Sequence, residues 1–151
     1  MIHECVCPCG ESDFAFSGRP LLRFNCHCTL CQEAYQAPFV DAVLWLTDKP
    51  VEVGSKKIVF EQRRGPLSID RGFCVDCAAP VFGKFRQKML ERVAFVSVRN
   101  MPQGFNAPPV DLHIFYETRQ ADVADGLPKH QGYLRSQLAF TRLMMKRMRA
   151  A

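Results

Sequence analysis

The sequence predicts a mainly β fold that is followed by one C-terminal helix. Between residues 12 and 117, short apolar runs are separated by turn signals rich in glycine, proline and asparagine. Such short runs are typical of strands, whose side chains point alternately to the two faces of a sheet. From residue 131 the apolar spacing becomes that of a helix. We expect residues 1–128 to form one folded domain, because a chain of this length can bury a real core, and 129–151 to form an appended basic helix.

The predicted strands follow from the alternation of apolar residues and the turn residues between them. In the first, residues 12–17, Phe14 and Phe16 alternate with small residues, and a Ser-Gly-Arg-Pro turn at 17–20 follows. A second short strand at 21–25 leads into a group of cysteines, and one helical turn is predicted over 31–35. The later strands are predicted over residues 39–46, 51–53, 57–62, 67–71, 80–86, 92–98 and 112–117, with a loop at 100–109.

The C-terminal segment has an amphipathic helical pattern. Its predicted apolar side contains Leu134, Leu138, Met145 and Met148, widened by Phe140 and Met144. A narrow opposing stripe is basic and contains Arg135, Arg142, Lys146 and Arg149. We predict that the apolar side packs on the body of the protein or on a second subunit, which would give a homodimer. Docking of the helix on membrane lipid or on nucleic acid is the alternative.

The net charge of +5 belongs to this C-terminal segment. From Lys129 to the end there are six basic and no acidic residues, so the first 128 residues carry 14 basic (20 − 6) against 15 acidic. A nearly neutral body does not favour a nucleic-acid partner. No apolar run approaches the roughly 20 residues of a membrane span, and no signal peptide is apparent, so we expect a cytoplasmic protein. In a reducing compartment its eight cysteines favour metal over disulfides, with an iron–sulfur cluster as a further alternative.

The stretch Cys26-His27-Cys28-Thr29-Leu30-Cys31 holds three thiols within six residues. A strand would point Cys26 and Cys28 to one face, and a turn could bring Cys31 round to meet them. Three converging thiolates suit Zn²⁺ and leave one position open for water or substrate. The alternative is a closed structural site in which a nearby residue supplies a fourth ligand. His27 lies between the cysteines and is expected to pack behind them rather than to bind the metal.

Four further cysteines form two pairs that are far apart in the sequence. Cys7 and Cys9 lie near the N-terminus, whereas Cys74 and Cys77 have the C-x₂-C spacing of a zinc knuckle. Together the two pairs could supply a closed tetrahedral site that ties the N-terminus to the middle of the chain. Cys5 is then left without a role.

The cysteine motifs, in this order, resemble those of one family. Cys7-Pro8-Cys9-Gly10, the stretch 26–31 and Gly72-Phe73-Cys74-Val75-Asp76-Cys77 are similar to the glutathione-dependent formaldehyde-activating enzyme family, also called the centromere-protein-V domain family. Leu112-His113-Ile114-Phe115 and Asp125-Gly126-Leu127-Pro128 look like its closing segments. The resemblance covers roughly residues 5–128.

The resemblance implies a fold, two zinc ions and a reaction. The fold is a β-tent like that of a Rab exchange factor, with small antiparallel sheets around a structural zinc. The ligand sets that the family implies are Cys7, Cys9, Cys74 and Cys77 for the structural zinc, and Cys26, Cys28 and Cys31 for a catalytic zinc. The founding reaction joins glutathione and formaldehyde into S-hydroxymethylglutathione and is classed with the carbon–sulfur lyases.

The chain departs from the family pattern at four positions. Basic residues usually follow the three-cysteine motif, with a glycine soon after, but here Gln32, Glu33 and Gln36 stand there. Ala78 replaces the glycine that commonly follows the last cysteine. We therefore predict a zinc-dependent enzyme that acts on a thiol and a small aldehyde but uses glutathione weakly. The alternative is a zinc-stabilised binding or scaffold module without catalysis.

Overall fold

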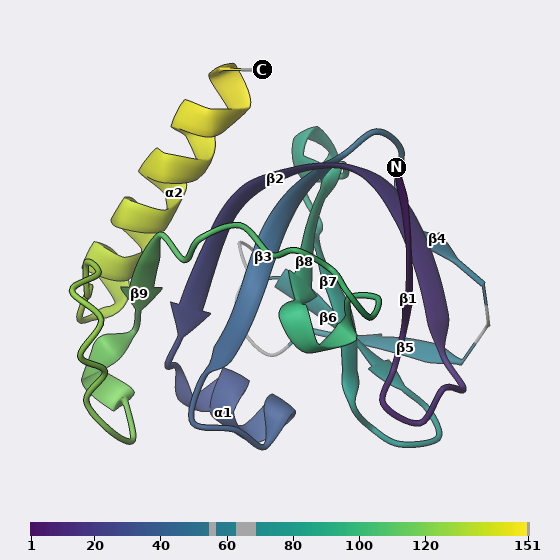
Figure 1. The fold of residues 1–151 in the computed structure, drawn as a ribbon, viewed down its shortest axis with the longest axis horizontal. Helices are drawn as coiled ribbons and strands as arrows, with labels where there is room; N and C mark the ends of the chain where they lie inside the picture. The colour runs from purple at the N-terminus through teal and green to yellow at the C-terminus, as the bar shows by residue number, and fades with distance from the viewer. Residues whose placement is uncertain (55–56, 63–68, 151) are drawn as a thin grey trace.

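The computed structural model describes residues 1–54, 57–62 and 69–150, and it confirms a mainly β fold with a C-terminal helix (Figure 1). The described residues form one curled sheet with the strand order β1-β2-β3-β8-β7-β6-β5, in which β4 and β9 also pair with β2. The strands are β1 (Ile2–Val6), β2 (Asp13–Cys26), β3 (Val40–Thr47), β4 (Glu52–Val53), β5 (Ile58–Glu61), β6 (Ile69–Cys74), β7 (Pro80–Phe85), β8 (Val93–Ser97) and β9 (Leu112–Ile114). The helices are α1 (Thr29–Tyr35), α2 (Tyr133–Arg149) and the short 3₁₀ turns η1 (Lys88–Leu90), η2 (Val98–Asn100) and η3 (Tyr116–Thr118).

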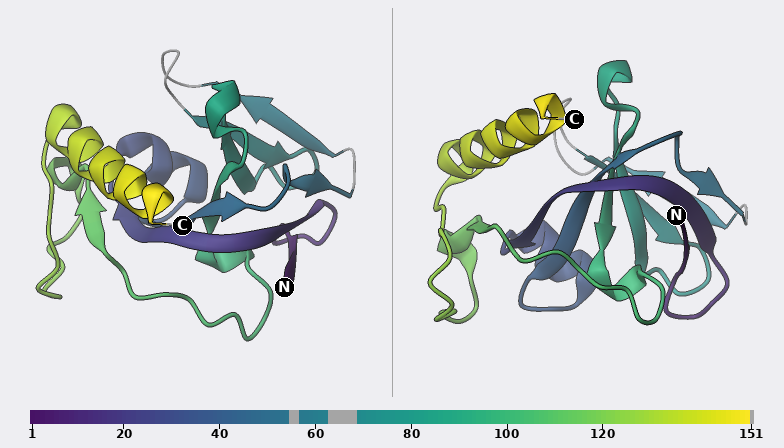
Figure 2. Two further views of the ribbon diagram at one scale, coloured as in Figure 1. Left: turned by 90° about the horizontal axis from the view of Figure 1, so that it is seen from above. Right: turned by 45° about the horizontal axis from the view of Figure 1, so that its top comes forward.

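The predicted turn at residues 17–20 is wrong, because β2 runs through it as one strand of 14 residues. Figure 2 shows this strand as a long arch across the molecule. Gly18 allows a close approach to β3, since a Cβ at this position would lie 2.2 Å from the carbonyl oxygen of Leu46. The register then shifts between Pro20 and Leu22. The glycine and proline therefore mark a bulged bend in a strand, which is one of the few places where a sheet accepts them.

Other predicted boundaries also change. β1 was not predicted, and it pairs along the first half of β2. The last strand ends at Ile114 rather than near residue 117, because Phe115 takes a left-handed conformation with φ 52° before η3. The predicted turn at Gly54-Ser55 and the start of the predicted strand at Leu67 lie partly outside the described residues.

The alternating side chains of β3 separate two buried cores on opposite faces of the sheet. Ala42 and Leu44 face one core, whereas Val43 and Trp45 face the other. The first core includes Leu22, Phe24, Cys26, Cys28, Cys31, Phe95, Ile114, Phe140 and Met144. The second core includes Cys5, Cys7, Phe14, Phe16, Cys74, Phe82 and Val96. Cys26, Cys28 and Cys31 therefore belong to the first core, whereas Cys7 and Cys74 belong to the second.

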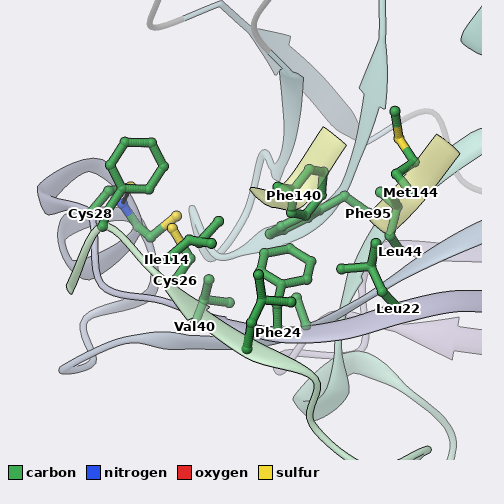
Figure 3. Packing of buried hydrophobic residues seen from close by; sticks show 14 of the residues in the cluster. Leu22, Phe24, Cys26, Cys28, Val40, Leu44, Phe95, Ile114, Phe140 and Met144 are labelled. Carbon is green, nitrogen blue, oxygen red and sulfur yellow. Dashed lines mark hydrogen bonds between the residues drawn. The ribbon is translucent and has the colours of Figure 1, made fainter. Parts of the chain in front are cut away.

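Helix α2 packs on the body, and half of its predicted apolar side is confirmed. Phe140 and Met144 are buried in the first core, and Met148 packs against it. Leu134, Leu138 and Met145 were predicted on the same side but are 80%, 51% and 38% exposed. Phe140 meets Phe24 edge to face with ring centroids 4.9 Å apart. Figure 3 shows Phe140 and Met144 in the same core as Cys26 and Cys28, which lie farther to the left in this view. Pairing of α2 with a second subunit stays a prediction.

Polar groups fix the direction in which α2 crosses the body. Arg147 makes a bidentate ion pair with Asp111, at 2.6 and 2.8 Å, and donates to the carbonyl oxygen of Leu21. Near the other end, Ser136 Oγ accepts a hydrogen bond of 2.8 Å from the backbone N–H of Phe115. Bidentate pairs are geometrically specific, so Arg147 fixes the rotation of the helix as well as its position. Among the described residues, no helix is both long and apolar enough to cross a membrane.

Candidate metal centres

The first candidate centre is the four-cysteine cluster of Cys7, Cys9, Cys74 and Cys77. The turn between β1 and β2 supplies Cys7 and Cys9, whereas the last residue of β6 supplies Cys74 and the turn after it supplies Cys77. All four sulfur atoms lie within 4.8 Å of one another, and those of Cys9 and Cys74 are 3.8 Å apart. Zinc–sulfur bonds of about 2.3 Å in a tetrahedron place the thiolates about 3.8 Å apart. The donor set and its spacing therefore fit a closed zinc site.

Local hydrogen bonds prepare this cluster for negative charge. Burial opposes ionisation of Cys74, but donation from the Ser12 hydroxyl and from the amides of Cys77 and Asp76 lowers its pKa to about 6. The Ser12 amide also donates to the sulfur of Cys7 over 3.3 Å. Amide donors of this kind stabilise thiolates, which are the form that binds a metal.

Two non-glycine residues near the clusters have left-handed backbones. Ala78, directly after Cys77, has φ 57°, and Gln36, at the end of α1, has φ 48°. Both are positions where the resemblance described above led us to expect glycine. The turns thus keep the conformation that glycine adopts most easily, at a cost of about 1–2 kcal/mol for each residue that carries a Cβ.

The second candidate centre is the three-cysteine cluster of Cys26, Cys28 and Cys31. β2 ends at Cys26, and α1 begins three residues later at Thr29, so the first helical turn brings Cys31 back toward the strand. The backbone N–H of Cys31 donates to the sulfur of Cys28 over 3.3 Å. The three sulfur atoms lie within 4.8 Å of one another and are buried, and no fourth Cys, His, Asp or Glu of the described residues joins them.

The electrostatics of this cluster also favour a metal-binding thiolate. Hydrogen bonds from the thiols of Cys26 and Cys31 hold the pKa of Cys28 far below its usual value, against the opposing effect of burial. Arg71, on β6, points its guanidinium at the cluster and lies 3.7 Å from the sulfur of Cys31. Burial lowers the pKa of Arg71, but the thiolates outweigh burial and raise it. Sequence reasoning missed Arg71, because nothing in the linear pattern places β6 beside residue 31.

Behind the cysteines a buried chain of side chains runs from His27 to the surface. His27 Nε2 lies 2.8 Å from His113 Nδ1, and His113 Nε2 lies 2.6 Å from a carboxylate oxygen of Asp125. The carboxylate requires a proton on His113 Nε2, so a neutral His113 accepts from His27 at Nδ1. Burial lowers the pKa of His27 to about 4, so this ring is neutral at pH 7. The chain ties the end of β2 to β9 and agrees with the prediction that His27 packs behind the cysteines.

Gln32 contributes to the same loop. Its side-chain amide donates to the carbonyl oxygens of His27 and Thr118, both over 2.7 Å, and accepts from Gln120 over 3.1 Å. The resemblance described above led us to expect a basic residue at this position. The amide of Gln32 is thus engaged in holding the loop of the three-cysteine cluster.

A cavity of about 530 Å³ opens beside the three-cysteine cluster. All three cysteines line it, together with Arg71 and a wall of apolar side chains from the sheet and α2. Sequence reasoning placed Phe140 and Met144 on the apolar side of α2, but it did not predict the cavity, because nothing in the linear pattern brings α2 beside the cysteines.

Sequence spacing therefore grouped seven of the eight cysteines as the structure places them. Cys5 lies in the second core, outside both clusters, and burial raises its pKa to about 12. This thiol behaves as a small apolar core residue.

Comparison with known proteins points to one family. The profile of the family described as glutathione-dependent formaldehyde-activating enzyme matches residues 2–118. A crystal structure of a Rhodobacter sphaeroides protein aligns with a TM-score of 0.50 and 17% identity, covering 70% of this chain and 91% of that one. At this identity the second comparison supports the fold alone. Among curated proteins no relative matches the chain.

Proposed function

The chain belongs to the glutathione-dependent formaldehyde-activating enzyme family, and from this premise we propose that it is a zinc-dependent enzyme that joins a thiol to a small aldehyde. The observation that carries this proposal is the three-cysteine cluster. Its three sulfur atoms converge without a fourth ligand among the described residues, and they line a cavity. Three protein ligands and an open position are the arrangement of catalytic rather than structural zinc sites.

Cys26, Cys28 and Cys31 are the residues that we propose to hold this zinc. When bound there, zinc would supply a site that keeps a substrate thiol in its reactive thiolate form at neutral pH. Arg71 balances the negative charge of the cysteines, and the chain of His27, His113 and Asp125 holds their loop in place. Burial of the cluster excludes bulk water from the reacting atoms.

The reaction needs no oxidant or reductant. The sulfur of the substrate thiol attacks the carbonyl carbon of the aldehyde, so that a C–S bond forms while the C=O π bond breaks. The thiol releases one proton and the carbonyl oxygen takes up one proton, so no net proton is gained or lost. The product is a hemithioacetal. The reverse reaction is the carbon–sulfur bond cleavage for which lyases are named.

The four-cysteine cluster has a different proposed role, as a closed structural zinc site. Its ligands join two distant turns, and its donor set leaves no position for a substrate. We thus propose two zinc ions for each chain, of which one serves folding. We also propose a cytoplasmic location, because metal binding by the two clusters needs cysteines that stay reduced.

Exchange NMR tests this proposal directly. With ¹³C-formaldehyde and 2-sulfanylethanol, the zinc-loaded protein should accelerate exchange between aldehyde and adduct in proportion to its concentration. Cys28→Ser should abolish the acceleration, whereas Cys5→Ala, which removes a thiol outside both clusters, should retain it. A folded, zinc-loaded protein that accelerates no thiol would instead be a zinc-stabilised binding module.

A further inference from the structure

The cavity beside the three-cysteine cluster is apolar over most of its surface. Its walls include the side chains of Phe24, Phe85, Phe95, Ile114, Phe115 and Phe140. At about 530 Å³ it falls within the roughly 300–1,000 Å³ range of small-molecule sites. It is far larger than a sulfur atom and a one-carbon aldehyde require. The remaining space must therefore suit some other part of the substrate.

Arg71 is the only cationic side chain among the described residues that line the cavity. Its guanidinium already faces the cysteines, 3.7 Å from the sulfur of Cys31. Three thiolates around Zn²⁺ carry a net charge of −1, which this one cation neutralises. No second cation among the described lining residues remains to meet a carboxylate of a substrate.

Among the described lining residues, this charge pattern disfavours glutathione, which carries two carboxylates and one ammonium group at neutral pH. A carboxylate that loses water without gaining a partner costs several kcal/mol. An uncharged ring or alkyl chain gains free energy from the same walls, because its apolar surface leaves water.

Helix α2 supplies the part of the cavity that lies outside the family match. Phe140 and Met144 line the wall, and Gln137 and Thr141 line it from the adjacent, exposed side of the helix. Figure 3 shows Phe140 and Met144 over the same core that holds Cys26 and Cys28. Residues 133–144 follow the matched segment 2–118, so this wall is a feature of the present chain that the family match does not cover.

We propose that the thiol substrate of this protein carries an uncharged apolar group, of the size of a benzyl or short alkyl chain, which lies in the cavity against α2. This inference rests on the proposed function, because it places the sulfur of the thiol substrate at the three-cysteine cluster. It assigns to α2 the role of a specificity wall.

Binding of thiols to the Co²⁺-substituted full-length protein tests the inference without relying on turnover. The visible absorption of Co²⁺ changes when a thiol joins its ligands, and a difference spectrum removes the constant contribution of the four-cysteine cluster. The probes are phenylmethanethiol, 2-sulfanylethanol and glutathione. We expect half-saturation by phenylmethanethiol at a concentration roughly 10- to 100-fold below those of the other two, because only its ring is buried.

Two matched variants locate the bound group. Thr141→Arg places a cation on the cavity side of α2 and should shift the preference from phenylmethanethiol toward glutathione by about 10-fold. Gln137→Arg, one turn earlier on the same side, should act in the same direction. Leu138→Arg adds the same charge at a position that is 51% exposed and outside the cavity lining, and it should leave the preference unchanged.

The outcomes separate this inference from the proposed function. One outcome is that every thiol changes the spectrum but glutathione binds as tightly as phenylmethanethiol. This result would overturn the apolar assignment and leave the proposed function intact. If Leu138→Arg and Thr141→Arg change the thiol preference equally, the bound group does not lie in the cavity. No spectral change with any thiol, 2-sulfanylethanol included, would overturn the proposed function and this inference with it.

Discussion

The two cysteine clusters differ in how much chain they connect and in what surrounds them. The four-cysteine cluster joins turns that are separated by 65 residues between Cys9 and Cys74, and two of its cysteines are exposed. The three-cysteine cluster connects only six residues, yet all three of its cysteines are buried beside a cavity. A metal in the first would stabilise the fold by holding distant segments together. A metal in the second would close only a short loop but would lie where a ligand can reach it.

The cores beneath the clusters sharpen this contrast. The four-cysteine cluster belongs to the core shared by β1, β2 and β7, whereas the three-cysteine cluster belongs to the core that α2 covers. Changes in one region should consequently leave the other region largely intact. Three predictions test this separation, in order of decreasing effect.

The largest expected effect is the loss of a metal ligand from the four-cysteine cluster. Structural zinc contributes on the order of 10 kcal/mol to folding, which is comparable with the whole stability of a domain, about 5–15 kcal/mol. Cys77→Ser should therefore leave little soluble protein. Cys28→Ser should stay folded, bind about one zinc fewer per chain and lose activity. Soluble yield, thermal melting and zinc content measure the difference.

The control for this pair is Cys5→Ala, which should retain both zinc ions. If Cys28→Ser and Cys77→Ser collapse equally, both clusters are structural, and the catalytic proposal for the three-cysteine cluster is lost.

An intermediate effect is expected from removing residues 129–151. We propose that residues 1–128 fold without α2, because both cysteine clusters and all the described strands lie before it. The deletion removes Phe140 and Met144 from the first core, which should lower the free energy of unfolding by about 3–6 kcal/mol. Zinc in the four-cysteine cluster should persist, whereas binding of phenylmethanethiol should be lost.

Urea unfolding and zinc content of the truncated protein measure these effects. Arg147→Lys in the full chain is the milder comparison, because lysine cannot make the bidentate pair with Asp111. A truncated protein without a cooperative transition would show that α2 belongs to the folding unit and that the division at 128 is wrong.

The smallest effect concerns Ala78 and Gln36, two of the three non-glycine residues with left-handed backbones among the described residues. Ala78→Gly should raise the free energy of unfolding by about 1 kcal/mol or less, since relief of the left-handed strain is partly offset by the flexibility of glycine in the unfolded chain. Gln36→Gly should act similarly on α1. Ala79→Gly is the matched control. Ala79 has no positive φ, so glycine at this position should lower the free energy of unfolding. Stabilisation by all three substitutions would show that left-handed strain is not the cause.

The sequence by itself determined what depends on neighbours along the chain. The spacing of Cys26, Cys28 and Cys31 predicted a three-thiol cluster, because a strand end and one helical turn suffice to bring these side chains together. The C-x₂-C spacing of Cys74 and Cys77 predicted a metal-binding turn for the same reason. The alternation of apolar residues gave most of the strands and hence the mainly β fold.

Only the tertiary structure decided which segments meet. The bend at Gly18 is part of one strand because β1 pairs with the residues before it and β3 pairs from Gly18 onward, and local turn propensity cannot reveal that pairing. The inward side of α2 is set by Asp111 and Phe24, which bind Arg147 and Phe140 from far along the chain. Arg71 likewise reaches Cys31 only through the order of strands in the sheet. Contacts of this kind depend on the packing of distant elements, and the free energy that selects them arises only when those elements are buried together.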